Sequence, residues 1–130
     1  MPTYYLRMEG VNLDSVLSDT NQISVIRGAS LLLREATHRI EEKFAFTKFA
    51  FTKISSGASI GLFQFEALDQ DAAEPIRQQV ADYLSQDEQL RYFTFVVDIQ
   101  AESGDFVQDK EALIARNRFR QLQQPTFAFP

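Results

Sequence analysis

The stretch FAFTKFAFTKISSGASIGLFQFEA, residues 44–67, determines the fold that the sequence predicts. It opens with two tandem copies of Phe-Ala-Phe-Thr-Lys. Because five is an odd number, the second copy turns its phenylalanines to the opposite face of any regular strand. Both copies therefore cannot lie alike in one strand, and we expect residues 44–48 to end a helix and residues 49–55 to form a β-strand.

The second half of this stretch predicts the partner strand of a β-hairpin. The small residues at 55–59 are typical of a tight connection between strands. Residues 60–67 alternate in character, which places Leu62 on one face of a strand and Phe63 and Phe65 on the other. We therefore expect two antiparallel strands joined by a short turn near the middle of the chain.

Periodicity outward from the hairpin predicts the remaining elements. Capping-type residues at 18–21 precede a long apolar stripe with helical spacing, and Asp69 and Asp71 precede a second, whose buried side is Ala73, Ile76, Val80 and Leu84. Before the hairpin we expect a strand at 4–8 that ends in a turn at Glu9–Gly10, then a short helical turn at 13–17 and a helix from about 21. After the hairpin we expect a helix that ends in an exit at 85–89 and a strand at 92–99. The chain then continues with a helix marked by Ala112, Ala115, Phe119 and Leu122, and with an extended tail at 125–130.

This order of elements predicts one α+β domain over residues 1–130. Strand, helix, strand, strand, helix and strand form the split βαβ, or ferredoxin-like, arrangement. We expect a four-stranded antiparallel sheet with two helices on one face, followed by the C-terminal helix and tail. The opposite, open face of the sheet is where this architecture commonly carries its function, and the fold alone does not choose among functions.

Composition excludes several classes of protein. The chain has no cysteine and one histidine, His38, which excludes disulfides, thiolate metal sites and multi-histidine metal sites. No apolar run is long enough for a membrane helix, and the start lacks the pattern of a signal peptide, so we expect a cytoplasmic protein without membrane contact. The net charge is −5, with acidic residues concentrated at 69–111, so we do not expect direct RNA binding.

Two further segments carry a family resemblance. Glu9-Gly10-Val11-Asn12 ends the first strand, and Arg27-Gly28-Ala29-Ser30-Leu31-Leu32 lies early in the long helix. Together with the small-residue hairpin at 54–62 and the segment 117–121, in this order, they resemble the first palm domain of the large subunit of type III CRISPR effector complexes. The resemblance spans nearly the whole chain, although that subunit carries two palms and further domains in one polypeptide.

The resemblance implies a palm of the nucleotidyl-cyclase or polymerase type in antiviral defence. The active palm of that family joins ATP into cyclic oligoadenylates and presents Gly-Gly-Asp-Asp at its hairpin. Such chemistry uses two divalent metals held by carboxylates. Here the corresponding residues are Ser56-Gly57-Ala58-Ser59, residues 54–65 contain no acid, and Glu9 is the one acid on the first strand.

We therefore expect a degenerate palm, a pseudoenzyme with no catalytic residue and no metal site of its own. The resemblance implies a second palm as partner, in a homodimer or on another type III effector subunit, with ATP and Mg²⁺ bound only in such a pair. Two alternatives remain open from the residues: a nucleotide-binding sensor without turnover, and an RNA-recognition-type binding module.

Seven residues are candidates for contact with a nucleotide. Each has a structural alternative: a plain hairpin turn, a glycine that lets another backbone approach, or a solvated acid at a strand end. For Glu9, one retained metal ion is a further alternative. The candidates are Glu9, Gly10, Arg27, Gly28, Ser56, Gly57 and Ser59.

Two further groups are candidates for an interface. Arg116 and Arg120 share a helix face from which Arg118 points away, so two of these arginines can converge on a phosphate or an acidic partner. Phe127 and Phe129, between prolines, are candidates for contact with a partner. Four aromatic residues could stack on RNA, but we expect them to pack under the helices instead: Phe63, Phe65, Phe93 and Phe95.

Overall fold

The computed structural model describes residues 1–11, 23–44, 50–57, 60–91 and 93–123, with backbone alone for residues 11 and 23–33. The four strands form one antiparallel sheet in the order β2-β3-β1-β4. This order confirms the predicted α+β, ferredoxin-like fold. The elements are β1 (Thr3–Val11), α2 (Ile23–Phe44), β2 (Thr52–Ser56), β3 (Ile60–Glu66), α3 (Gln70–Gln86), β4 (Thr94–Ala101) and α4 (Phe106–Gln123).

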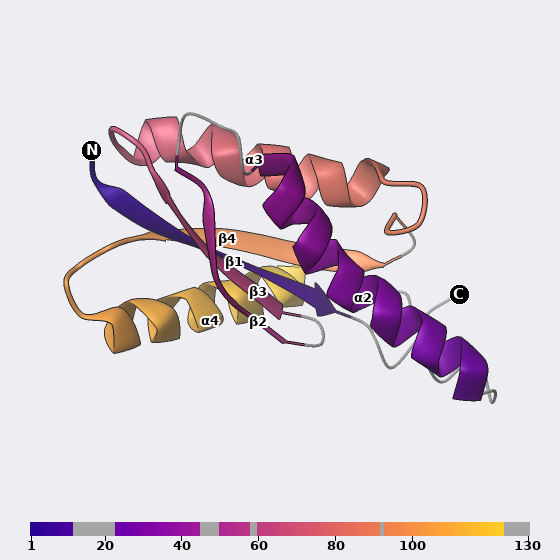
Figure 1. Ribbon diagram of the computed structural model, residues 1–130. Helices are drawn as coiled ribbons and strands as arrows, with labels where there is room; N and C mark the ends of the chain where they lie inside the picture. The colour runs from indigo at the N-terminus through magenta and orange to yellow at the C-terminus, as the bar shows by residue number, and fades with distance from the viewer. Residues whose placement is uncertain (12–22, 45–49, 58–59, 92, 124–130) are drawn as a thin grey trace.

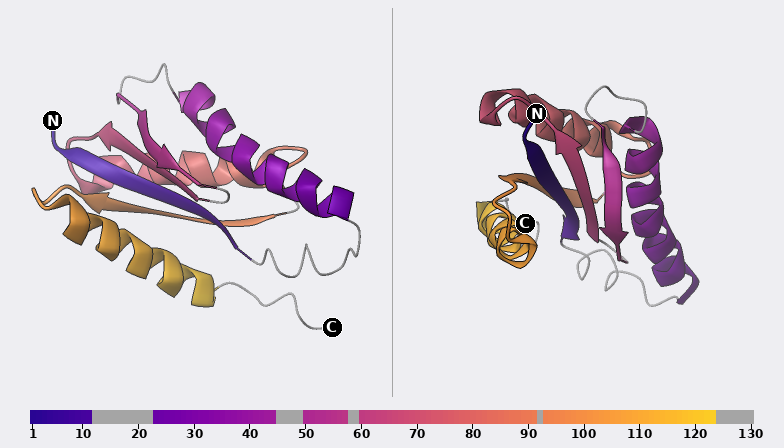
Figure 2. Two further views of the ribbon diagram at one scale, coloured as in Figure 1. Left: turned by 60° about the horizontal axis from the view of Figure 1, so that its bottom comes forward. Right: turned by 60° about the vertical axis from the view of Figure 1, so that its left-hand side comes forward.

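The helices lie on both faces of the sheet (Figures 1 and 2). α2 and α3 cover one face, as predicted, whereas α4 lies against the opposite face over β1 and β4. The expectation that this second face is open is therefore wrong where α4 covers it. No described helix combines the length and the apolar character needed to cross a membrane. The predicted helical turn at 13–17 and the tail at 125–130 lie outside the described residues.

The face under α2 and α3 holds the main hydrophobic core. Tyr4, Leu6 and Met8 alternate along β1 and point into it. The ring of Phe51 stacks on those of Phe63 and Phe65, with centroids 4.9 Å and 6.3 Å apart. Burying each such side chain contributes about 1.5–3 kcal/mol to folding.

The same core contains aromatic residues that were candidates for stacking on RNA bases. Phe63 and Phe65 are fully buried under the helices, which confirms the prediction that they pack rather than present their rings. Phe95 packs against this core from β4, and its ring meets that of Phe93 edge-on at 6.5 Å. The aromatic residues of the central strands are therefore closed to a stacked base.

The tandem repeat sends its two copies into different elements, as the odd spacing predicts. Phe44 is the last residue of α2, and its ring lies 5.4 Å from that of Phe51, so both copies reach one core. β2, however, begins at Thr52 and not at residue 49. Ala50 has a φ of 53°, in the left-handed region that a regular strand cannot contain, and this explains the later start.

α3 follows the predicted pattern closely. Asp69 caps it by accepting a hydrogen bond from the amide of Ala72 at 2.9 Å, and the four predicted apolar positions are buried. The helix continues to Gln86, so the exit predicted at 85–89 begins two residues late, and Asp87 orders the following turn. Burial acts to raise the pKa of Asp87, because it disfavours the charged form of the carboxyl group. The amides of Gln89 and Leu90 and the guanidinium of Arg39 outweigh this effect, so the pKa lies below its usual value.

α4 is the predicted C-terminal helix, but it turns an unexpected side to the sheet. Its buried residues are Asp109, Leu113 and Asn117, spaced four apart on one line. The apolar residues that mark the helix in the sequence do not form its buried stripe, since Phe119 is 64% and Leu122 84% exposed. The apolar contact beneath α4 is a small cluster of Tyr5, Leu62 and Leu113, with the ring of Phe106 edge-on to Tyr5 at 5.4 Å, and polar residues lie beside it.

Candidate functional site

The sheet face beneath α4 carries a cluster of buried charged side chains. Arg7 and Glu9 are two residues apart on β1, so both point to this face, and Asp98 lies directly across from Arg7 on β4. All three are at most 6% exposed. Charges buried to this extent are costly unless each has a partner.

Asn117 of α4 joins this cluster to the helix. Its side-chain oxygen accepts a hydrogen bond from the guanidinium of Arg7, and its amide nitrogen donates to Asp98 Oδ2 at 2.7 Å. Asn117 is fully buried. An amide side chain has a donor and an acceptor fixed in one plane, which suits a position between a cation and an anion.

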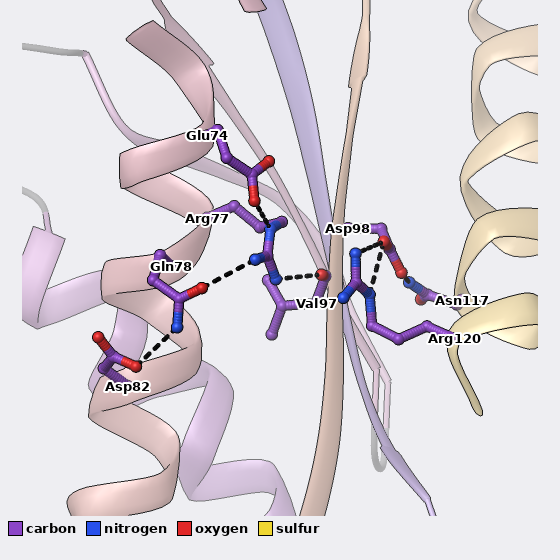
Figure 3. A network of polar contacts seen from close by, with 8 residues as sticks. All are labelled: Glu74, Arg77, Gln78, Asp82, Val97, Asp98, Asn117 and Arg120. Atoms are coloured by element: carbon purple, nitrogen blue, oxygen red, sulfur yellow. Dashed lines mark hydrogen bonds and ion pairs between the residues drawn. The ribbon is translucent and has the colours of Figure 1, made fainter. Parts of the chain in front are cut away.

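Two arginines of α4 complete the pairing of the carboxylates. Arg120 places its Nε and a terminal nitrogen each 2.8 Å from Asp98 Oδ1 (Figure 3). Glu9 lies 3.4 Å from a nitrogen of Arg7 and 3.9 Å from one of Arg118. Arg118, which we predicted to point away from the face that Arg116 and Arg120 share, has its contact with Glu9, whereas Arg120 pairs with Asp98.

Glu9 occupies a different setting from the one predicted. β1 continues to Val11, so Glu9 and Gly10 lie within the strand and not in a turn, and the reading of Glu9 as a solvated acid is wrong. Its carboxylate faces arginines. Among the described residues, no three side chains of the types that bind metals lie together in a way that would hold an ion.

The hairpin turn lies beside the end of β1, because Glu9 pairs with Ile60 at the start of β3. The fold thus places Glu9 and Gly10 at the same end of the sheet as Ser56 and Gly57, with β3 between the two pairs. The amide of Gly57, however, donates to the carbonyl of Ile60 at 2.8 Å and closes the turn. It is therefore engaged within the turn and not free to bind a phosphate.

The other predicted candidates fall in three places. Arg27 and Gly28 lie within α2, where the backbone alone is described. Ser59, Phe127 and Phe129 lie outside the described residues. His38 is exposed on α2, as predicted, with its Nε2 3.0 Å from a carboxylate oxygen of Glu42.

The hairpin has one position where a glycine is required. A Cβ on Gly61 would lie 3.0 Å from the ring of Phe63 and 3.1 Å from the side chain of Thr37. α2 therefore approaches β3 closely at this point, which explains Gly61 by packing and not by ligand binding.

A second polar group protects the edge of the sheet. β4 is an edge strand, so some of its backbone groups have no strand partner. Arg77 of α3 is buried and donates to the carbonyl of Val97 at 3.2 Å, while Glu74 and Gln78 hold its other nitrogens (Figure 3). β4 is thus held by α3 at its edge and by α4 through Asp98.

Sequence reasoning missed the roles of Arg7, Asp98 and Asn117. One signal was available for Asp98, an acid inside the apolar run Phe95–Ile99, where a charge needs a partner. Arg7 and Glu9 at alternate positions of one strand were a second signal. Asn117 gave no signal, because its importance depends on which side of α4 meets the sheet.

Comparisons with known proteins bear on the fold. No protein-family model matches the chain, and no curated protein matches its sequence. Among solved structures, an EAL/GGDEF domain protein from M. capsulatus has a TM-score of 0.62 at 18% identity, covering 92% of this chain and 79% of that chain.

Two further solved structures agree with this finding. The active GGEEF domain of a diguanylate cyclase from Vibrio cholerae has a TM-score of 0.58 at 11% identity, covering 91% of this chain and 78% of that one. A bacterial light-regulated adenylyl cyclase has a TM-score of 0.59 at 13% identity, covering 89% and 70%. At these identities the likeness concerns the fold, which is the palm-like fold of GGDEF and nucleotidyl-cyclase domains.

Proposed function

We propose that this chain is a catalytically silent palm-like domain of a nucleotide-signalling system. The fold it shares with cyclase domains supports the link to nucleotides. The observation that carries the proposed silence is the state of the carboxylates: residues 54–65 contain none, and Glu9 and Asp98 face arginines.

Metal-assisted nucleotidyl transfer explains why this observation matters. Two divalent ions activate the attacking hydroxyl and neutralise charge on the phosphates, and carboxylates hold those ions. A carboxylate that accepts hydrogen bonds from guanidinium groups has its lone pairs and its charge already engaged. In this chain the hairpin turn contains serines and no acid, and the carboxylate of Glu9 on the neighbouring strand faces guanidinium groups.

Turnover by the purified chain tests this proposal. We expect no cyclic, dinucleotide or oligomeric product from ATP or GTP with Mg²⁺ or Mn²⁺ by mass spectrometry. A product that Glu9→Gln abolishes, and that the exposed-residue variant Glu88→Gln retains, would overturn the silence.

We further propose that the domain pairs with a second palm, either its own copy or another chain, and that the system is a type III CRISPR effector. The order of Glu9-Gly10, Arg27–Ser30 and the small-residue hairpin supports this assignment. Light scattering measures self-association, and co-purification with a type III subunit that carries Gly-Gly-Asp-Asp measures the second pairing. A monomer that binds no such subunit would contradict the pairing.

An RNA-binding module is the weaker alternative, because Phe63 and Phe65 are buried beneath α2 and α3. We expect no binding of single-stranded RNA at low salt in a mobility-shift assay. A nucleotide-binding sensor is a stronger alternative, and a specific hollow on the molecule supports it.

A further inference from the structure

A hollow of about 390 Å³ lies where the C-terminal half of α4 meets β4. Its volume falls within the range of small-molecule sites in proteins. The described residues that line it come from α4, apart from one carboxylate of β4, and they are Asp98, Ala115, Arg116, Phe119, Arg120 and Gln123.

One wall of the hollow is fixed by the polar cluster. Arg120 is held by two contacts of 2.8 Å to Asp98 Oδ1, and Asn117 holds Oδ2 of the same carboxylate from behind (Figure 3). The charge of Asp98 is therefore compensated. The second terminal nitrogen of Arg120 takes part in neither contact, so this guanidinium is oriented and retains donor capacity.

A second guanidinium and an aromatic ring share the same wall. Arg116 lies one helical turn before Arg120 and is exposed, with no ion pair to another described residue. Phe119 is 64% exposed and lies three residues after Arg116, on the same side of the helix. An exposed phenylalanine between two arginines offers a planar surface next to positive charge.

We propose that this hollow binds a nucleoside phosphate. Arg116 and Arg120 would bind the phosphates, because guanidinium groups match phosphate oxygens in geometry and charge. Phe119 would stack on the base, and the amide of Gln123 can donate to or accept from the base edge. The lining of the hollow contains two arginines and one acid, Asp98, whose charge is already compensated. The hollow is therefore locally positive, although the chain has a net charge of −5.

This site is separate from the hairpin turn and requires no turnover. It therefore does not depend on the silence of the palm. Nucleotide binding in the hollow and product formation are separate properties, and either can be present without the other. The binding experiment can therefore fail while the proposed silence stands, and the reverse also holds.

Calorimetry with ATP and GTP tests the proposal, with tripolyphosphate and adenosine as separate ligands. We expect nucleotide to bind more tightly than either fragment. Arg116→Gln and Phe119→Ala should each weaken it about tenfold, the size expected for loss of one stacked ring or one charged contact. Both residues are exposed, so the two variants should fold and melt as the natural chain does.

Arg34→Gln is the matched control, because it removes one exposed arginine of α2 outside the hollow. It should bind ATP as the natural chain does. Three results would overturn the proposal: no binding of ATP or GTP at millimolar concentration, equal weakening by Arg34→Gln, or tripolyphosphate binding as tightly as ATP.

Discussion

The two faces of the sheet are built on different physical principles. Tyr4, Leu6 and Met8 of β1 point to one face, where α2 and α3 close an apolar core. Arg7 and Glu9, at the alternate positions, point to the other face, where α4 closes a hydrogen-bonded cluster of charges. A single strand thus contributes to both.

The two faces contribute to the fold in different ways. Apolar burial is non-directional and contributes roughly in proportion to the area removed from water. Buried charges contribute little net stability, but they specify an arrangement in which every partner must be present. We infer that α2 and α3 supply most of the stability of the domain, and that α4 sets the chemistry of the second face.

The largest expected effect is on the apolar face. Phe63→Ala removes a fully buried ring that stacks on Phe51, and it should lower the free energy of unfolding by about 3–5 kcal/mol. Urea denaturation measures this loss. The exposed-residue control Leu122→Ala should change stability by less than about 0.5 kcal/mol. A loss below about 1 kcal/mol for Phe63→Ala would contradict the role given to this core.

On the polar face, we expect the effects of two substitutions on the free energy of unfolding to be non-additive. Asp98→Ala and Asn117→Ala each remove a partner from the cluster, and each should cost about 1–3 kcal/mol. The double variant should cost less than the sum of the two, with a coupling energy of about 0.5–3 kcal/mol. A double-mutant cycle by chemical denaturation measures this value. Simple additivity would show that the hydrogen bond between these side chains has no energetic role.

α4 should open more readily than α3. The apolar cluster beneath α4 is small, consisting of Tyr5, Leu62 and Leu113, whereas α3 packs into the main core. Native-state hydrogen exchange should therefore give α4 amides an opening free energy at least about 1 kcal/mol below that of α3 amides. Equal protection of both helices would remove the distinction between the faces.

The smallest expected effect comes from Asp87, at the turn after α3. Its pKa lies below the usual value, so its contribution is present above about pH 4 and is lost as the pH falls through the folded-state pKa. Asp87→Asn should cost about 1 kcal/mol or less at pH 6 and less still at pH 3. Denaturation at both pH values measures the difference, with Glu88→Gln as control. A cost that grows toward low pH would contradict this prediction, because the contribution of Asp87 would then have the opposite pH dependence.

The sequence predicted the apolar face well. Hydrophobic periodicity located α3 and its buried residues, and the odd repeat separated the end of α2 from the start of β2. These features depend on local spacing, which is visible in the chain itself. The early start predicted for β2 failed because the left-handed φ of Ala50 has no signal in a non-glycine residue.

The polar face was harder to predict because its contacts join distant residues. Arg7 and Asn117 are 110 positions apart, and their hydrogen bond depends on which side of α4 meets the sheet. The apolar residues of α4 suggested the wrong side, since Phe119 and Leu122 are exposed. The candidate nucleotide residues were only partly grouped. The fold places Glu9 and Gly10 at the sheet end where the hairpin turn lies, whereas Arg118 and Arg120 of α4 meet the sheet through Glu9 and Asp98.

Manganese titration by NMR tests whether the carboxylates of the second face are committed to arginines and do not hold metal. Bound Mn²⁺ broadens the amide signals of residues near it. With Mn²⁺ alone, in the absence of nucleotide, we predict that the amides of Glu9 and Asp98 lose no more intensity than other amides. Selective broadening of both signals, abolished by Glu9→Gln together with Asp98→Asn, would contradict the account.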